Sequence, residues 1–189
     1  MVEKLVGLPV ASGDALLEAL RELERRFSQN AAVLPQSEEP RDLWAGVFFR
    51  IGDIELLAPL EEIGEVLELP RDITPIPSTK TWVCGIANNR GSLLPIFDLQ
   101  AFLLGTSTVR NVKARVLVVR QETFPFGLLV GEVVGIRHFD VSARAQEAPD
   151  LDDLLMPWVV GSFAWDEQHY PVFNLHRLSS DETFNLVAA

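Results

Sequence analysis

The sequence holds very little cysteine or histidine chemistry. Cys84 is the one cysteine in 189 residues, which excludes an internal disulfide and fits a reducing compartment. Of the three histidines, His169 and His176 lie seven positions apart with Pro171 between them, which is not the i,i+4 spacing of a helical zinc pair. The sequence therefore predicts no metal site and no cofactor.

Basic residues are also scarce. The chain has 16 Lys and Arg against 27 Asp and Glu, a net charge of −11, and no basic stripe of the kind that nucleic-acid-binding proteins carry. An anionic membrane surface would repel such a chain. No stretch approaches the roughly 18 apolar residues of a spanning helix, and no secretory signal opens the sequence. We expect a cytoplasmic protein that neither binds nucleic acid nor inserts into the membrane.

The residue clusters that would support catalysis are missing as well. Gly85 and Gly91 lie six apart without a following Gly-Lys-Ser/Thr, so no phosphate-binding loop is indicated. The carboxylate pairs Glu61-Glu62 and Asp152-Asp153 are adjacent in sequence and point apart on either a helix or a strand. We therefore expect a protein that is not an enzyme.

One catalytic alternative stays open at this level. A small-molecule-binding or enzymatic β-barrel would use Cys84 or His169, the groups with nucleophilic or acid–base capacity. Cys84 stands between Val83 and Gly85 on an expected strand, where a small buried hydrophobic residue is the simpler interpretation. Rapid alkylation of the native thiol would favour the alternative.

What the sequence does contain is an internal repeat. Six residues recur with identical spacing 76 positions later: Trp82, Val83, Gly85, Pro95, Phe97 and Leu99 return as Trp158, Val159, Gly161, Pro171, Phe173 and Leu175. Two copies are too few for a solenoid and indicate one small fold used twice. Between these positions the copies differ, with Asn88-Asn89-Arg90-Gly91 in the first and Ala164-Trp165-Asp166-Glu167 in the second. Shared positions should hold the fold, and the divergent segment can carry a function of its own.

Hydrophobic periodicity divides the chain into an extension and a β-rich part. Residues 1–42 predict a helix, with an apolar seam of Leu16, Leu20, Leu23 and Phe27, followed by a linker; that seam packs either on its own domain or on a partner. Short strands and close turns then fill residues 43–180. A short tail or helix at 181–189 closes the chain.

We expect an all-β class in which each copy forms a small closed barrel of about five strands. The barrels would span about 43–110 and 111–180, with a groove between them and an acidic insertion at 140–157 that has no counterpart in the first copy. Leu99 to Leu104 predicts one or two helical turns closed by Gly105. Residues 61–68 indicate a short helix that runs into a strand.

The segment from Asn88 to Gly91 is the best candidate for a binding site. Gly91 can adopt a positive φ at a hairpin corner, and Asn88 or Asn89 can occupy the left-handed region beside it. Turn chemistry alone explains those three residues but does not require Arg90. An exposed arginine on a rigid hairpin suits carboxylate recognition and interface hot spots, so we favour a protein interface over a plain solvated turn.

These residues resemble a known family. Gly85 to Leu99 reads Gly-Ile-Ala-Asn-Asn-Arg-Gly-Ser-Leu-Leu-Pro-Ile-Phe-Asp-Leu, which is similar to the Gly-x-x-Asn-Leu-Arg-Gly-x-x-x-Pro-x-x-Asp-Leu signature of CheW-like adaptor domains. The resemblance covers about residues 43–178. The leucine-rich N-terminal segment and the Trp82-Val83 pair resemble the members that serve type IV pilus (twitching motility) chemosensory systems.

The resemblance implies two SH3-like β-barrels and no catalysis. It further implies an adaptor that couples the cytoplasmic tips of chemoreceptors to the regulatory domain of a CheA-type histidine kinase, itself CheW-like. Asn88, Asn89, Arg90 and Gly91 fall on the family's coupling region, and the match of 61–66 to the receptor-groove segment adds Ile63 and Glu65. Three departures from the family pattern are Asn89 for Leu, Gly131-Glu132 for Asp-Gly, and Asn174 for Asp.

Overall fold

The structure is a computed structural model that describes residues 42–121, 124–146, 151 and 153–188. The helix expected over Leu16 to Phe27 lies outside these residues. Within them the chain is mostly β. The strands are β1 (Leu43–Ile51), β2 (Ile54–Pro59), β3 (Ile63–Glu68), β4 (Ile73–Thr74), β5 (Val83–Asn89), β6 (Ser92–Asp98), β7 (Arg115–Val119), β8 (Phe126–Val130), β9 (Glu132–Asp140), β10 (Arg144–Ala145), β11 (Val159–Trp165) and β12 (Gln168–Phe173).

Short helices connect or follow these strands. The α-helices are α2 (Leu99–Leu104), α3 (Leu175–Ser180) and α4 (Glu182–Asn185), and the 3-10 helices are η1 (Leu60–Glu62), η2 (Val141–Ala143) and η3 (Met156–Trp158). The expected stop of α2 is confirmed, since Gly105 follows it with φ 69°. At the end of the chain, α3 runs through Ser180, and Asp181 caps α4 by accepting a hydrogen bond from Phe184 N at 2.8 Å.

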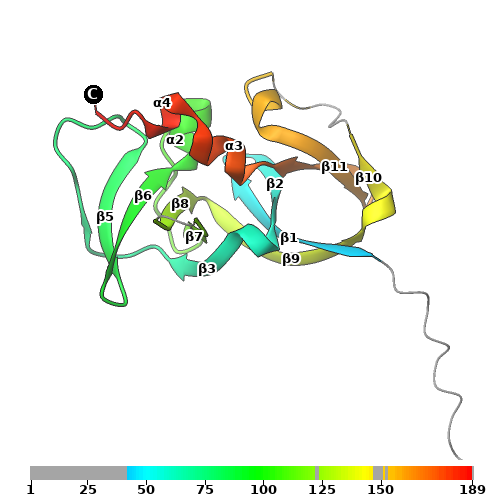
Figure 1. Cartoon of the computed structure of the whole chain (residues 1–189), viewed down its shortest axis with the longest axis horizontal. Helices are drawn as coiled ribbons and strands as arrows, with labels where there is room; N and C mark the ends of the chain where they lie inside the picture. Colours follow the sequence, from blue (N-terminus) through cyan, green and yellow to red (C-terminus); the bar gives the residue numbers. More distant parts are fainter. Residues whose placement is uncertain (1–41, 122–123, 147–150, 152, 189) are drawn as a thin grey trace, which may run out of the picture. The chain divides into compact units, whose positions relative to one another are not determined.

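The strands form two six-stranded sheets (Figure 1). Sheet A has the order β10-β11-β12-β2-β1-β9, and sheet B, read from its far edge, has the order β4-β5-β6-β8-β7-β3. Each contains one parallel pair, β12 with β2 in sheet A and β6 with β8 in sheet B. The two orders correspond strand for strand, so the internal repeat of the sequence is also a repeat of topology.

The sheets are not assembled from consecutive halves of the chain. Sheet A combines β1 and β2 of the first repeat with β9 to β12 of the second, and sheet B combines β3 to β6 with β7 and β8. This differs from our expected division at 43–110 and 111–180, because each repeat contributes its first hairpin to the sheet of the other. The strand count per sheet also exceeds the expected five, the extra members being the two-residue strands β4 and β10.

The core has three parts. One cluster lies inside sheet A and contains the stacked rings of Phe139 and Phe163, whose centroids are 4.7 Å apart. A second lies inside sheet B around Ile96 and Val116. The largest contains residues of both sheets, such as Phe49 and Leu117, together with the three α-helices. Burying this shared apolar surface is the main stabilisation of one sheet against the other.

Candidate functional site

The first tip, Asn88 to Gly91, joins β5 to β6 as a two-residue turn. Asn89 still pairs with Ser92, so Arg90 and Gly91 form the loop, with φ values of 51° and 89°. Positive φ at both central residues is the pattern of a type I′ turn, whose twist matches that of the strands. Our expectation that Asn88 or Asn89 takes the left-handed position is wrong, because both remain in the ladder. Asn88 Oδ1 instead accepts a hydrogen bond from Gly91 N at 2.8 Å.

Arg90 therefore occupies a corner that is unfavourable for its backbone. A left-handed conformation costs a residue with a Cβ about 1–2 kcal/mol, and Asn or Gly would lower that cost. At the second corner, a Cβ on Gly91 would meet no atom within 4 Å. Glycine is therefore favoured there by the positive φ angle and not by a lack of space for a side chain. Backbone preference does not account for an arginine at this tip, and its side chain is 80% exposed.

Glu65 on β3 contacts two side chains of the first tip. Its Oε1 accepts a hydrogen bond from Asn89 Nδ2 at 2.5 Å, and its Oε2 lies 3.0 Å from Arg90 Nη2. A surface ion pair of this kind contributes under about 1 kcal/mol to stability. The effect of the ion pair is geometric: the part-buried Glu65 carboxylate fixes the direction of the exposed Arg90 guanidinium, whose remaining N–H groups stay available to a partner.

Ile63 and Glu65 lie on opposite faces of sheet B. Ile63 is opposite Val119 and Glu65 is opposite Val118, so Gly64 is an extra, unpaired residue in β3. Such a β-bulge reverses the faces of the residues that follow it. Ile63 consequently packs, 4% exposed, in the core shared by the two sheets, whereas Glu65 joins the tip. The structure thus brings five of the six predicted site residues together and separates Ile63 from them.

Ile63 belongs to a groove beside the shared core. The hollow has a volume of about 510 Å³ and is lined by Leu43, Trp44, Ala45, Leu60, Glu61, Ile63, Gly64 and Arg120. Val66 and Ile136 pair with Leu117 and Val47 of the shared core, so they lie on the same faces as these core residues while remaining exposed. Leu43, Val66 and Ile136 were not predicted from the sequence. Val66 and Ile136 are apolar residues on the edge strands β3 and β9, and Leu43 is the first residue of the interior strand β1.

The second tip, Trp165 to Glu167, has the same backbone as the first and different side chains. Trp165 pairs with Gln168, and Asp166 and Glu167 form the loop with φ values of 51° and 65°. In place of an ion pair, the guanidinium of Arg137 lies 5.1 Å from the ring centroid of Trp165. This confirms that the divergent segments of the two repeats are structurally equivalent.

The residues of the catalytic alternative do not assemble. Cys84 lies on β5 of sheet B and His169 on β12 of sheet A. Burial, reinforced by the charge of Asp98, raises the pKa of the Cys84 thiol to about 11, so the reactive thiolate is scarce at neutral pH. The features of an activated nucleophile are therefore lacking at Cys84.

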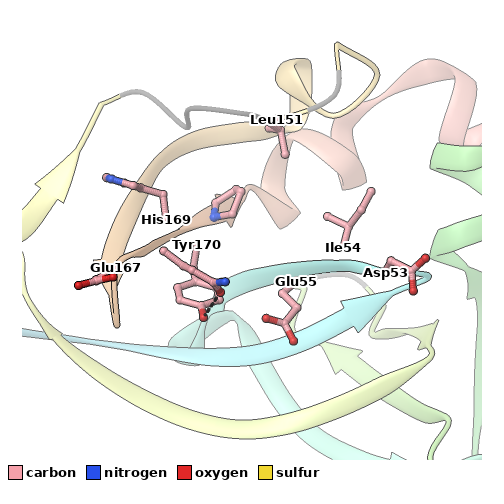
Figure 2. Close-up of a pocket in the computed structure, with 9 residues that line it drawn as sticks. Asp53, Ile54, Glu55, Leu151, Glu167, His169 and Tyr170 are labelled. Carbon is pink, nitrogen blue, oxygen red and sulfur yellow. Dashed lines mark hydrogen bonds between the residues drawn. The ribbon is translucent and has the colours of Figure 1, made fainter.

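His169 lies instead in an open hollow of about 530 Å³ on sheet A (Figure 2). Figure 2 shows Asp53 and Glu55 of the β1–β2 hairpin on one side and His169 and Tyr170 of β12 on the other. His169 Nδ1 is 3.5 Å from Ser162 Oγ, at the outer limit of a hydrogen bond. That distance and the exposure of the ring do not form a catalytic pair.

Among the residues that the structure describes, no group of three His, Cys, Asp or Glu side chains is placed to hold a metal ion. None of the helices there has the length and apolar character needed to cross a bilayer.

Comparison with known proteins gives the family. The profile of the CheW-like domain matches residues 45–183, which include the first tip, nearly all of both sheets and all of the groove lining except Leu43 and Trp44. The chain belongs to the CheW-like family. It is 40% identical to Protein PilI of Pseudomonas aeruginosa over 171 residues, which cover 90% of this chain and 95% of that protein.

More distant relatives match shorter or less similar stretches. FrzA of Myxococcus xanthus is 32% identical over 94 residues, covering 50% of this chain and 58% of that protein. The chemotaxis protein CheW of Helicobacter pylori is 27% identical over 138 residues, covering 71% and 82%. The fold matches the crystal structure of the scaffolding protein TtCheW from Thermoanaerobacter tengcongensis with a TM-score of 0.64 at 22% identity, covering 74% of this chain and 89% of that one.

Proposed function

We propose that this CheW-like protein is a non-catalytic adaptor that links the cytoplasmic tips of chemoreceptors to a CheA-type histidine kinase. Its likeness to Protein PilI over 90% of the chain supports a role in a type IV pilus system that controls twitching motility. The protein works in the cytoplasm and needs no cofactor. Each sheet, with its own buried cluster, is a barrel of the SH3-like type.

The first tip is the contact for the kinase regulatory domain. The observation that carries this assignment is the exposed Arg90 side chain, held by Glu65 on a corner that disfavours arginine. A guanidinium fixed in this way has lost part of its rotamer freedom before binding, which lowers the entropic cost of association. Its partner group is a carboxylate or backbone carbonyl that Arg90 reaches with the N–H groups not used by Glu65.

The groove is the contact for the receptor. Val66 and Ile136 do not line the hollow itself, but as exposed apolar side chains on the shared-core faces of β3 and β9 they extend the proposed receptor contact and suit the apolar face of a docked helix. The tip and the groove lie on opposite faces of β3, divided by the Gly64 bulge. One short strand therefore connects the two proposed contacts, and both partners can bind one molecule at once.

The two contacts can be tested separately in one reconstitution. Purified kinase regulatory domain and a receptor cytoplasmic fragment are titrated with wild type, Arg90→Asp and Ile136→Asp. We expect Arg90→Asp to weaken kinase binding at least about tenfold and to leave receptor binding within about twofold. Ile136→Asp should show the reverse pattern. Asp166→Arg, at the equivalent corner of the second tip, is the matched control and should alter neither affinity.

Loss of both affinities in a single folded variant would contradict the division into two contacts. Unchanged kinase binding in Arg90→Asp would remove the first tip from the kinase interface. Failure of the wild type to bind either partner would overturn the adaptor function itself.

A further inference from the structure

A basic, apolar loop interrupts the acidic surface of the protein between α2 and β7. Residues 99–120 contain no Asp or Glu, although the chain as a whole has a net charge of −11. Within the loop, Val109 and Val112 are 71% and 91% exposed. Arg110 directly follows Val109, Lys113 directly follows Val112, and both basic residues are also exposed. We call residues 109–113 the basic loop.

Hydrogen bonds at both ends give the basic loop a fixed conformation. At its start, Thr108 N and Oγ1 both donate to the buried carboxylate of Asp98, at 2.8 and 2.7 Å. At its end, Asn111 Oδ1 accepts from Lys113 N at 2.8 Å and from Ala114 N at 3.2 Å. Ala114 is buried. The two exposed valines are therefore held in place before any partner binds, which reduces the ordering cost of docking.

An acidic, apolar turn with complementary properties precedes β11. Leu154 and Met156 are 59% and 52% exposed, and Asp153 beside them is exposed too. Leu155, between them, is fully buried in the shared core and its carbonyl accepts from Trp158 N at 2.9 Å. This acidic turn, residues 153–156, is thus also fixed, with two apolar side chains directed outward on either side of an anchor.

Neither segment has the same character as its counterpart in the other repeat. The basic loop follows the helix α2, whereas the chain after the equivalent helix α3 continues directly into α4. The acidic turn lies between β10 and β11, and the corresponding connection between β4 and β5, residues 75–82, contains no Asp or Glu. Each segment presents two apolar side chains and charge of one sign, and the signs are opposite. Since Val112 and Met156 remain exposed, the described residues of their own chain cover neither of them.

We propose that the basic loop of one molecule docks on the acidic turn of a second copy. The valines pack on Leu154 and Met156, and Arg110 faces Asp153. The Lys113 ammonium lies 3.4 Å from Glu132 Oε1 of its own chain, so it adds less positive charge to the contact than Arg110 does. Two different surfaces meet, so the contact is head-to-tail and repeats along a row of molecules instead of closing as a symmetric dimer. The contact is small, below the roughly 800 Å² per partner of stable complexes, and it is therefore weak and transient.

Sedimentation velocity of the full chain, from about 10 to 500 µM, tests the contact in the affinity range of small transient interfaces. We expect the weight-average mass to rise with concentration in low salt. Raising the ionic strength to about 0.5 M should weaken association several-fold, because exposed charges are screened. Val112→Ser and Met156→Ser should each weaken association at least about fivefold. Both positions are exposed, and Val109→Ser is a second loop variant if Val112→Ser proves unstable.

Mixing the variants distinguishes this contact from any other. An equimolar mixture of Val112→Ser and Met156→Ser contains one intact pair, the acidic turn of the first variant and the basic loop of the second. We expect the mixture to form dimers but nothing larger. Phe124→Ser is the matched control: it also removes an exposed apolar side chain, outside both segments, and should associate as the wild type does.

Three results would overturn the proposal. The wild type could stay monomeric at about 500 µM, the serine variants could associate as strongly as the wild type, or their mixture could remain as monomeric as each variant alone. None of these depends on kinase or receptor, so failure here leaves the proposed adaptor function to its own test.

Discussion

The two hairpin tips have the same backbone and opposite chemistry. Both are two-residue turns with positive φ at each corner, Arg90 and Gly91 in one, Asp166 and Glu167 in the other. The first is polar, with Glu65 holding an arginine by an ion pair. The second is aromatic, with Arg137 stacked on Trp165. The backbone of the turn is thus a property of the repeated fold, and we propose that function resides in the side chains that differ.

The positions that the repeats share explain why the backbones agree. Asp98 N donates to Trp82 O, and Asn174 N donates to Trp158 O, each at 2.7 Å. Gly85 and Gly161 have φ values of 131° and 127°. These residues place the hairpin, its helix and the neighbouring short strand in the same way in both sheets.

The largest effect is expected from adding a methyl group at the shared glycines. A Cβ on Gly85 would lie 2.2 Å from Thr74 O, and one on Gly161 would lie 2.4 Å from Ala145 O, in each case a rigid backbone atom. Gly85→Ala and Gly161→Ala should each destabilise the protein by about 2–4 kcal/mol, through strain at a special φ and overpacking. Urea unfolding followed by circular dichroism measures both.

The matched control is Gly91→Ala, where φ is 89° and no atom lies within 4 Å of the added Cβ. That variant should lose only about 1 kcal/mol, from backbone conformation alone. If Gly85→Ala lost the expected stability and Gly161→Ala lost none, the two glycines would not be structurally equivalent.

A smaller effect is expected from Glu65→Ala, which frees the Arg90 side chain without removing it. Kinase binding should weaken about three- to tenfold, because the guanidinium must be ordered during association. The melting temperature should change by no more than about 3 °C, since the ion pair is a surface one. Arg137→Ala at the second tip should leave kinase affinity unchanged. Equal losses in the two variants, measured by isothermal titration calorimetry, would mean that the tips do not differ in function.

The repeats also differ at Cys84, which is equivalent to Val160. Cys84→Val should change stability by less than about 1 kcal/mol, as a volume-conserving replacement at a partly buried site. In the wild type, the raised pKa of about 11 keeps the thiol protonated. Iodoacetamide should therefore modify the native protein at pH 8 at least about tenfold more slowly than the unfolded chain. Modification as fast as in urea would restore the nucleophilic alternative.

The smallest effect concerns Glu62 at the end of η1. Burial, and then the charge of Glu61, raise the pKa of its carboxyl, while His176 acts in the opposite direction. The native state therefore binds this proton more tightly than the unfolded chain does, so stability falls as pH rises above the ordinary pKa of a glutamate. Glu62→Gln should raise the melting temperature at pH 7, and the gain should shrink at pH 4. A gain that is equal at both pH values would exclude ionisation as its cause.

Much of this structure was predictable from local patterns. Alternating and continuous apolar runs located the main strands, Gly105 marked the end of α2, and the matching residues around Trp82 and Trp158 revealed the duplication. The exchange of first hairpins between the sheets was not predictable in this way. Alternation shows which face of a strand is buried, but the pairing of β1 with β9 depends on contacts between residues about 90 positions apart.

The site was predictable as a segment and not in its geometry. Asn88 to Gly91 was correctly placed at a hairpin turn, but the exact register decides which residue takes each corner, and the sequence does not show that register. Likewise, Ile63 and Glu65 differ by two positions, which in a regular strand puts them on the same face. The unpaired Gly64 separates them, and a bulge of one residue leaves no reliable trace in apolar periodicity.

We propose above all that the first tip, and not the second, binds the kinase. Titration of the purified kinase regulatory domain with Arg90→Asp and Asp166→Arg tests it most directly, since the two changes reverse charge at equivalent corners. We expect at least about a tenfold loss of affinity for Arg90→Asp, with its melting temperature nearly unchanged, and no loss for Asp166→Arg. Equal affinities for both variants, or a loss confined to Asp166→Arg, would contradict it.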